Sequence, residues 1–233
     1  MTPPRSRCRT RAAGGLAATY CTLAALALLA ACATPEDHLH TLRPAAAPRA
    51  PGAAGTGTTL VWVGPARVPE SVDRPGWVLR DGAHGLVLLE HQRWTQGLAA
   101  EIAEGLSVPL DDALAGTALR ALPDPQSVAR TGLRLRVTVL RFDSRIAPVP
   151  AVDDQIRWQL ECAAGEGATR RLDGLGPLVG LREVAQAAGA ADGPVRYEQL
   201  ARGHAAVLAQ VAADVAVRLR SLPPDALARC PAD

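Results

Sequence analysis

Apolar and polar residues alternate along several short segments of the chain, and this pattern predicts β-strands. Three apolar runs come first, and the second and third flank a glycine-containing turn; the runs are 60–63, 77–80 and 86–89. Further along, apolar residues alternate with arginine, threonine, glutamine or glutamate, so one face of each strand is apolar. These one-sided strands are 133–139 and 155–162, and 169–175 is expected to add a third.

A helical period marks two other segments. Apolar residues recur every four positions from Trp94 through Leu98 to Leu106, and a longer apolar stripe runs from Leu200 to Leu219 before Pro223 and Pro224. We expect the helical faces to be buried; the residues concerned are Trp94, Leu98, Leu208, Val211 and Val215. The predicted fold is α+β, a two-layer sandwich in which two long helices cover one face of a mainly antiparallel sheet of about six strands.

The N-terminus has the pattern of a bacterial lipoprotein signal. Arginines precede an apolar stretch that begins at Leu16, and the stretch closes with Leu29-Ala30-Ala31-Cys32, which matches a lipobox. Cleavage is predicted between Ala31 and Cys32, with a diacylglycerol on the Cys32 thiol. A spanning anchor is the alternative, but the stretch is too short and too rich in alanine for about 30 Å of hydrocarbon. Ala33, in place of Asp, favours the inner leaflet of the outer membrane, facing the periplasm.

Composition divides the chain into four parts. Residues 1–31 are the predicted signal peptide, and 32–58 are rich in alanine, proline and glycine, which favours a flexible tether in which 38–42 can form a short extended piece. Residues 59–222 are the predicted single domain, and 223–233 are a C-terminal tail.

Charge and cysteine content narrow the possibilities further. The net charge is only +2, and the mature part has no basic run with interleaved aromatic residues, so nucleic acid is not an expected partner. Three cysteines remain after processing: Cys32, Cys162 and Cys230. Cys162 lies on the predicted inward face of a strand, so it is either a buried free thiol or, in an oxidising compartment, the partner of Cys230 in a disulfide.

No catalytic or metal-binding motif stands out. Ser107 lies in a predicted helix without the second glycine of a nucleophile elbow, and His84 and His91 lack a metal-ligand spacing. The pairs Asp111-Asp112 and Asp153-Asp154 are expected in loops and turns, and His204 is expected to be a packing residue. The sequence therefore predicts no enzyme, no metal and no cofactor apart from the covalent lipid on Cys32.

The stretch from Val61 to Leu110 resembles the PqiC family of ABC-type transport auxiliary lipoproteins, which are associated with membrane integrity. The resemblance rests on Gly64-Pro65, Pro69-Glu70, Asp73-Arg74-Pro75 and Arg93-Trp94 in this order, and on the lipobox. It implies a non-catalytic subunit of a lipid-transport assembly that links the inner and outer membranes together with an MCE-domain protein of the PqiB type. Association with further copies of the chain stays open. The alternative is a stand-alone envelope lipoprotein with a structural or outer-membrane assembly role.

A partner surface is expected between the first two strands. Prolines stiffen the segment 68–77, so little entropy remains to be lost on docking. The candidate partner-binding residues are Glu70, Asp73, Arg74 and Trp77. The competing interpretation is that the prolines only shape a connection and that Trp77 fills the core.

Overall fold

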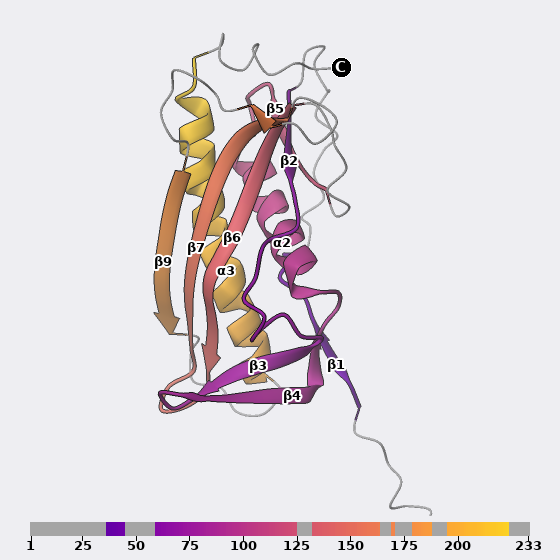
Figure 1. Cartoon of the computed structure of the whole chain (residues 1–233), viewed down its shortest axis with the longest axis vertical. Helices are drawn as coiled ribbons and strands as arrows, with labels where there is room; N and C mark the ends of the chain where they lie inside the picture. The colour runs from indigo at the N-terminus through magenta and orange to yellow at the C-terminus, as the bar shows by residue number, and fades with distance from the viewer. Residues whose placement is uncertain are drawn as a thin grey trace, which may run out of the picture. The chain divides into compact units, whose positions relative to one another are not determined.

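The computed structural model describes residues 36–44, 59–124, 132–163, 169–170, 179–187 and 195–223. These residues form nine strands and two helices (Figure 1). In chain order they are β1 (His38–His40), β2 (Thr59–Val63), β3 (Gly76–Asp81), β4 (Gly85–Trp94), α2 (Leu98–Ala113), β5 (Leu119–Pro123), β6 (Gly132–Arg145), β7 (Ala151–Ala163), β8 (Thr169–Arg170), β9 (Val179–Ala187) and α3 (Val195–Arg220).

The larger of two sheets has six strands, in the order β5-β2-β6-β7-β8, with β9 also paired to β7. Its centre is the antiparallel pair of β6 and β7, in which Leu135 lies opposite Leu160 and Val137 opposite Trp158. Strand β2 runs parallel to both β5 and β6. Because side chains alternate between the faces of a strand, the apolar row of β6 is buried on one face and its arginines lie on the other.

The smaller sheet has three strands in the order β1-β4-β3. Strands β3 and β4 form an antiparallel hairpin, and β1 pairs in parallel with the last residues of β4, where His38 lies opposite Gln92. Figure 1 shows this sheet at one end of β6 and β7, and the C-terminal end of α3 at the other. The contacts that join the sheets include a hydrogen bond from Trp77 Nε1 to Ser144 Oγ at 2.8 Å and a bidentate ion pair of Arg80 with Asp143.

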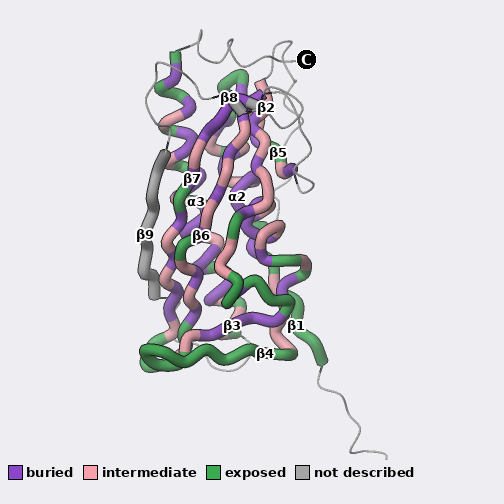
Figure 2. Tube along the Cα trace, in the orientation of Figure 1, coloured by how far each residue is buried: buried purple, intermediate pink, exposed green. Residues whose placement is uncertain are grey.

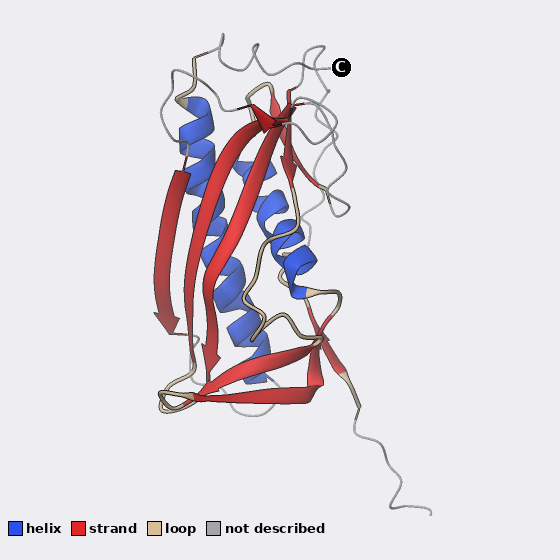
Figure 3. Ribbon diagram, viewed as in Figure 1, coloured by secondary structure: helices blue, strands red, loops and turns tan. Residues whose placement is uncertain are grey.

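Both helices cover the same face of the larger sheet (Figure 3). Helix α3 comes so close to β7 that a Cβ atom at Gly203 would lie 3.1 Å from a Val152 methyl carbon. The residues expected to be buried are buried, since Trp94, Leu98, Leu208, Val211 and Val215 are at most 5% exposed.

The predicted fold class is confirmed, and five details differ. Helix α2 begins at Leu98, because Trp94 ends β4 instead of opening the helix, and it continues through Pro109 to Ala113. The strand expected at 169–175 is described only at Thr169–Arg170, and β9 lies in a segment whose alanines and glycines concealed it. Strands β1, β3 and β4 form a sheet of their own.

The short extended piece expected at 38–42 is present as β1, and residues 37–43, which we call the N-terminal strap, are held to the core and are not part of a flexible tether. The Leu42 side chain is fully buried in the core, and the buried Glu101 carboxylate accepts hydrogen bonds from Leu42 N at 3.0 Å and from Thr41 Oγ1 at 2.9 Å. Thr95 Oγ1 donates to the same carboxylate. A single buried carboxylate therefore fixes the strap to the first turn of α2. The rest of the predicted tether, including Cys32 and residues 45–58, lies outside the described residues.

Within the described residues, one helix, α3, is long and apolar enough to cross a bilayer. More than half of that apolar stretch is buried inside the fold, because the helix packs on the larger sheet and on α2.

Candidate functional site

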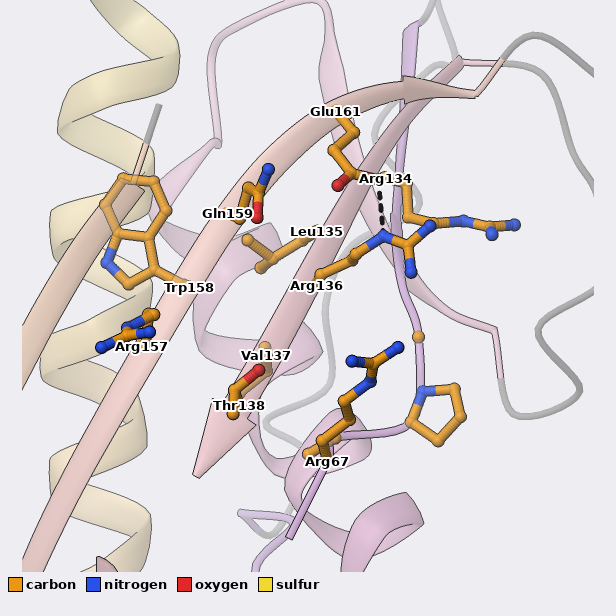
Figure 4. A pocket seen from close by; sticks show the side chains of 13 residues that line it. Arg67, Arg134, Leu135, Arg136, Val137, Thr138, Arg157, Trp158, Gln159 and Glu161 are labelled. Carbon is orange, nitrogen blue, oxygen red and sulfur yellow. Dashed lines mark hydrogen bonds and ion pairs between the residues drawn. The ribbon is translucent and has the colours of Figure 1, made fainter. Parts of the chain in front are cut away.

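A groove of about 530 Å³ lies on the face of the larger sheet that the helices leave uncovered. Its floor is formed by the outward side chains of β6 and β7, and one wall is the segment 64–67 that follows β2. The residues that give it its character are four arginines and one carboxylate: Arg67, Arg134, Arg136, Arg157 and Glu161 (Figure 4).

Two of these arginines are already matched by acidic partners. The Arg136 guanidinium forms an ion pair with Glu161, which lies on β7 two residues beyond Gln159, the residue opposite Arg136. Arg134 lies 3.7 Å from the buried carboxylate of Asp124. Arg67 and Arg157 are exposed, and no ion pair is found for either within the described part of the chain. The groove therefore presents excess positive charge to a ligand.

The wall of the groove is held in place by backbone hydrogen bonds. Arg67 bridges to β6, with its N–H donating to Val137 O at 2.9 Å and its carbonyl accepting from Val139 N at 2.8 Å. One residue earlier, Ala66 N donates to Ala99 O at 3.0 Å. Because the chain is tied to the sheet and to α2 here, the position of Arg67 is fixed before any ligand arrives.

The predicted partner-binding residues divide into two groups. Glu70, Asp73 and Arg74 are exposed in the connection between β2 and β3, beyond the wall of the groove. Trp77 is only 1% exposed, and its indole packs 4.3 Å from the Trp94 ring, centroid to centroid. The expectation that Trp77 anchors a partner is corrected: it fills the core, as the competing interpretation had it.

Behind the sheet, a chain of hydrogen bonds runs through the core from Trp77 to Asp154. The Ser144 hydroxyl lies 2.7 Å from His204 Nε2, and His204 Nδ1 lies 2.8 Å from the Asp154 carboxylate. Since Nδ1 faces a carboxylate, it carries the ring proton and donates it, and Nε2 accepts from the Ser144 hydroxyl. The Phe142 ring stacks on His204 with centroids 3.8 Å apart.

The connectivity from aspartate to histidine to serine is that of a hydrolase triad, but its environment is different. Ser144, Asp154 and His204 are each 0% exposed, so no substrate atom reaches the hydroxyl. Burial raises the pKa of Asp154, an effect that the nearby His204 opposes. The network joins the smaller sheet, both central strands and α3, and its position indicates a structural role. His204 is thus a packing residue, as the sequence predicts.

The remaining sequence candidates have structural positions. Ser107 is buried and donates to Glu104 O within α2. Asp111 and Asp112 lie near the C-terminal end of α2 and not in a loop, and Asp111 forms an ion pair with Arg120. Asp153 and Asp154 lie in β7 and not in a loop; they point to opposite faces, and Asp153 binds Arg141 at 3.0 Å. No cluster of three metal-ligating side chains occurs among the described residues.

Cys162 is 2% exposed and takes part in a disulfide, which excludes the free-thiol interpretation. Its partner is outside the described residues, as is Cys230, so the pairing of Cys162 with Cys230 stays a prediction.

The comparisons with known proteins agree with this architecture. One solved structure, described only as an uncharacterized protein, is 17% identical, with a TM-score of 0.53 over 79% of this chain and 99% of that one. A protein of the DUF330 family from Xanthomonas campestris is 16% identical, with a TM-score of 0.52 over 78% of this chain and 93% of that one. Both likenesses show the fold alone. No protein of curated function matches the sequence.

The family is shown by a sequence model that matches residues 40–216, which is most of the chain. The match begins within the N-terminal strap and ends in α3, so it spans both sheets and both helices. The chain belongs to the family of ABC-type transport auxiliary lipoprotein components.

Proposed function

We propose that the chain is a non-catalytic subunit of an MCE-type lipid-transport system, anchored through a lipid on Cys32 to the inner leaflet of the outer membrane. Its folded domain then faces the periplasm and docks an MCE-domain protein of the PqiB type. The family supports a role in transport, and the lipobox supports the anchor. The single observation that carries the docking role is the arginine-rich groove on the uncovered face of the larger sheet.

The chemistry of the groove favours an acidic peptide segment over an acyl chain. Its floor and wall present guanidinium groups, which bind carboxylates in a bidentate way and remain charged at any physiological pH. An acyl chain would leave these groups desolvated without a partner, which is costly. An extended segment with two or more acidic side chains satisfies Arg67 and Arg157 at once.

A non-catalytic role is consistent with the burial of the Ser144–His204–Asp154 network. A triad that acts on a substrate needs an open hydroxyl and donors aimed at the reacting oxygen. Here the hydroxyl is enclosed and accepts a hydrogen bond from Trp77 Nε1. The residues that most resemble catalytic machinery thus serve to hold the two sheets and α3 together.

The docking role is tested by charge reversal in the groove. Arg67→Glu combined with Arg157→Glu should abolish recovery of the MCE-domain protein after crosslinking in membranes, while the melting temperature stays unchanged. The matched control is Arg202→Glu, because Arg202 is an exposed arginine on α3 that pairs with Glu198 of the same helix. Equal recovery from the double variant and from the control would overturn the groove as the docking site.

The connection between β2 and β3 is a second docking candidate, and the same assay separates the two. Asp73→Ala with Arg74→Ala tests this connection without touching the groove, since both residues are exposed and lie beyond its wall.

The proposed lipid anchor on Cys32 has its own test. Cys32→Ala should leave an uncleaved precursor that takes up no labelled palmitate, and normal processing of that variant would contradict the lipobox.

A further inference from the structure

The smaller sheet exposes apolar side chains that the fold does not cover. Leu86, Val87 and Leu88 follow one another on β4 and are 44%, 42% and 51% exposed, and Leu39 on β1 is 64% exposed. We call these four residues the apolar rim. Figure 2 shows the first residues of β4 and the start of β1 as exposed, while most of the adjoining β3 is buried. Three consecutive exposed apolar residues are unusual in a strand that faces only water.

The rim also includes an open sheet edge. Strand β1 pairs only with the last residues of β4, from Gln92 to Trp94. Among the described residues, no strand pairs with the earlier part of β4 on that side. Charged groups nearby are mixed in sign, since Asp37 lies between His91 and Arg93. Contact at the rim is therefore governed by apolar surface and not by net charge.

The covalent distance from the proposed anchor identifies what covers the rim. His38, the first residue of β1, is only six residues after Cys32, and a fully extended chain of that length spans at most about 22 Å. The strap cannot lengthen this reach, because Leu42 is buried and the Glu101 carboxylate binds both Thr41 and Leu42. The smaller sheet must therefore stay beside the membrane that holds the lipid.

We infer that the apolar rim lies in the headgroup region of the bilayer into which the Cys32 lipid is inserted. This inference rests on the proposed anchor. Leucine and valine side chains partition into the boundary between headgroups and acyl chains, and a lipid anchor nearby adds to such binding. Water and phosphate oxygens in that region can still satisfy the open edge of β4.

This contact sets how far the groove stands from the membrane. Ser144 lies beside the smaller sheet and Arg136 lies eight residues earlier on β6, so the groove is about 26 Å farther along the strand. With the rim on the membrane, the uncovered face of the larger sheet stands away from the surface. The groove is then presented at a height that a periplasm-spanning partner can reach.

Fluorescence quenching by lipids tests the inference on the mature, lipidated protein. Leu86→Cys and Leu88→Cys are each labelled with an NBD fluorophore and reconstituted into vesicles of phosphatidylethanolamine and phosphatidylglycerol, with and without lipid brominated in the acyl chains. Val217→Cys is the matched control, because Val217 is also an exposed apolar residue, at 64%, but lies near the C-terminal end of α3. Unsubstituted protein measures any labelling of native cysteines.

Both rim labels should show blue-shifted emission that brominated lipid quenches, and the Val217 label should show neither effect. Rim labels that behave like the Val217 label in vesicles that co-float with the protein would overturn membrane contact and leave a protein partner as the occupant of the rim. Protein that fails to float with the vesicles would instead contradict the Cys32 anchor, and the inference with it. Two rim positions are used so that a local disturbance at one of them does not decide the result.

Discussion

Leu42 and Gly105 touch so closely that a Cβ atom at position 105 would lie 3.0 Å from both the Cβ atom and the carbonyl oxygen of Leu42. On the same side, Leu208 Cδ1 would be 2.9 Å away. Because glycine at position 105 has no side chain, the N-terminal strap and α3 can both pack directly against α2 at this point. The contact lies between a segment near the proposed lipid anchor and the centre of the core.

Gly105→Ala should destabilise the protein. Alanine is favoured over glycine inside a helix by about 1 kcal/mol, but overpacking a closed core costs about 1–3 kcal/mol. The Leu42 carbonyl belongs to the backbone and cannot turn aside, so we expect the cost to exceed the gain. Urea unfolding measures the difference. Gly97→Ala is the control, since nothing lies within 4 Å of a Cβ atom there; equal stability of the two variants would contradict the close packing.

Glu101→Gln should loosen the N-terminal strap. The carboxylate accepts from Thr41 Oγ1, Leu42 N and Thr95 Oγ1, and an amide offers one oxygen in place of two. Leaving a buried donor without a partner costs about 1–3 kcal/mol. Hydrogen exchange at residues 38–42 should accelerate more than exchange in β6. Glu104→Gln on the same helix removes an ion pair of 4.0 Å with the exposed Arg43 of the strap. Such an exposed pair contributes little, so strap exchange should accelerate far less in this variant than in Glu101→Gln.

The sequence predicts well those strands and helices that bury one face and expose the other. In β6 and β7 the alternation of apolar residues with arginine, glutamine and glutamate identifies both the strand and its inward face, because the helices cover only that face. The stripe from Leu200 to Leu219 identifies α3 for the same reason. Local composition misleads elsewhere: alanine, proline and glycine around Leu42 favour a tether, although one fully buried leucine and one distant carboxylate order the strap.

The candidate site is less predictable, because tertiary contacts assemble it. The arginines of β6 and β7 are expected on the outward face, but Arg67 reaches them only through its backbone bridge to Thr138. The sequence does carry a signal for the buried network. Asp154 shares a face of β7 with Val152 and Ile156, and His204 lies in the apolar stripe of α3, so two polar groups occupy apolar rows that pack together. Ser144 is concealed by the register shift between Val139 and Arg141.

Leu208→Ala should destabilise by about 2–5 kcal/mol, the usual range for a buried leucine. Leu208 is fully buried and lies against Gly105, so truncation leaves a cavity between the two helices. Val217→Ala, on the exposed face of the same helix, should change stability by about 0.5 kcal/mol or less. Urea unfolding of both variants checks the assignment of the helix faces, which would be wrong if the two losses were equal.

Cys162 should be linked to Cys230 in the mature protein. Once Cys32 carries lipid, Cys230 is the remaining cysteine of the processed chain. Peptide mapping without reduction should recover the two joined. Reduction should lower the free energy of unfolding by about 2–4 kcal/mol, since the bond closes a long loop. The Cys230→Ser variant should be insensitive to reductant, and a joined peptide that contains another cysteine would contradict the pairing.

Asp154 should make the stability of the domain depend on pH in a direction opposite to that of an exposed, ion-paired aspartate. Burial raises its pKa in the folded protein above the ordinary value of 3.8, Asp153 and Asp143 add to this effect, and His204 opposes it. Between these two pKa values the folded protein holds a proton that the unfolded chain has lost. Because the native state then binds more protons, this contribution to stability falls as pH rises from 3.8 through the native pKa.

Asp154→Asn isolates this contribution. Asparagine can still accept the hydrogen bond from His204 Nδ1, which lies 2.8 Å from the carboxylate, but it cannot ionise. The free energy of unfolding of the native protein, minus that of Asp154→Asn, should therefore decrease as pH rises from about 4 to about 7. Asp153→Asn is the control on the same strand, because Asp153 points outward and is paired with Arg141. Urea unfolding at a series of pH values gives both differences. A difference for Asp154→Asn that grows with pH would contradict this prediction, because it would show that the Asp154 carboxylate is ionised in the folded protein and stabilised there by its surroundings.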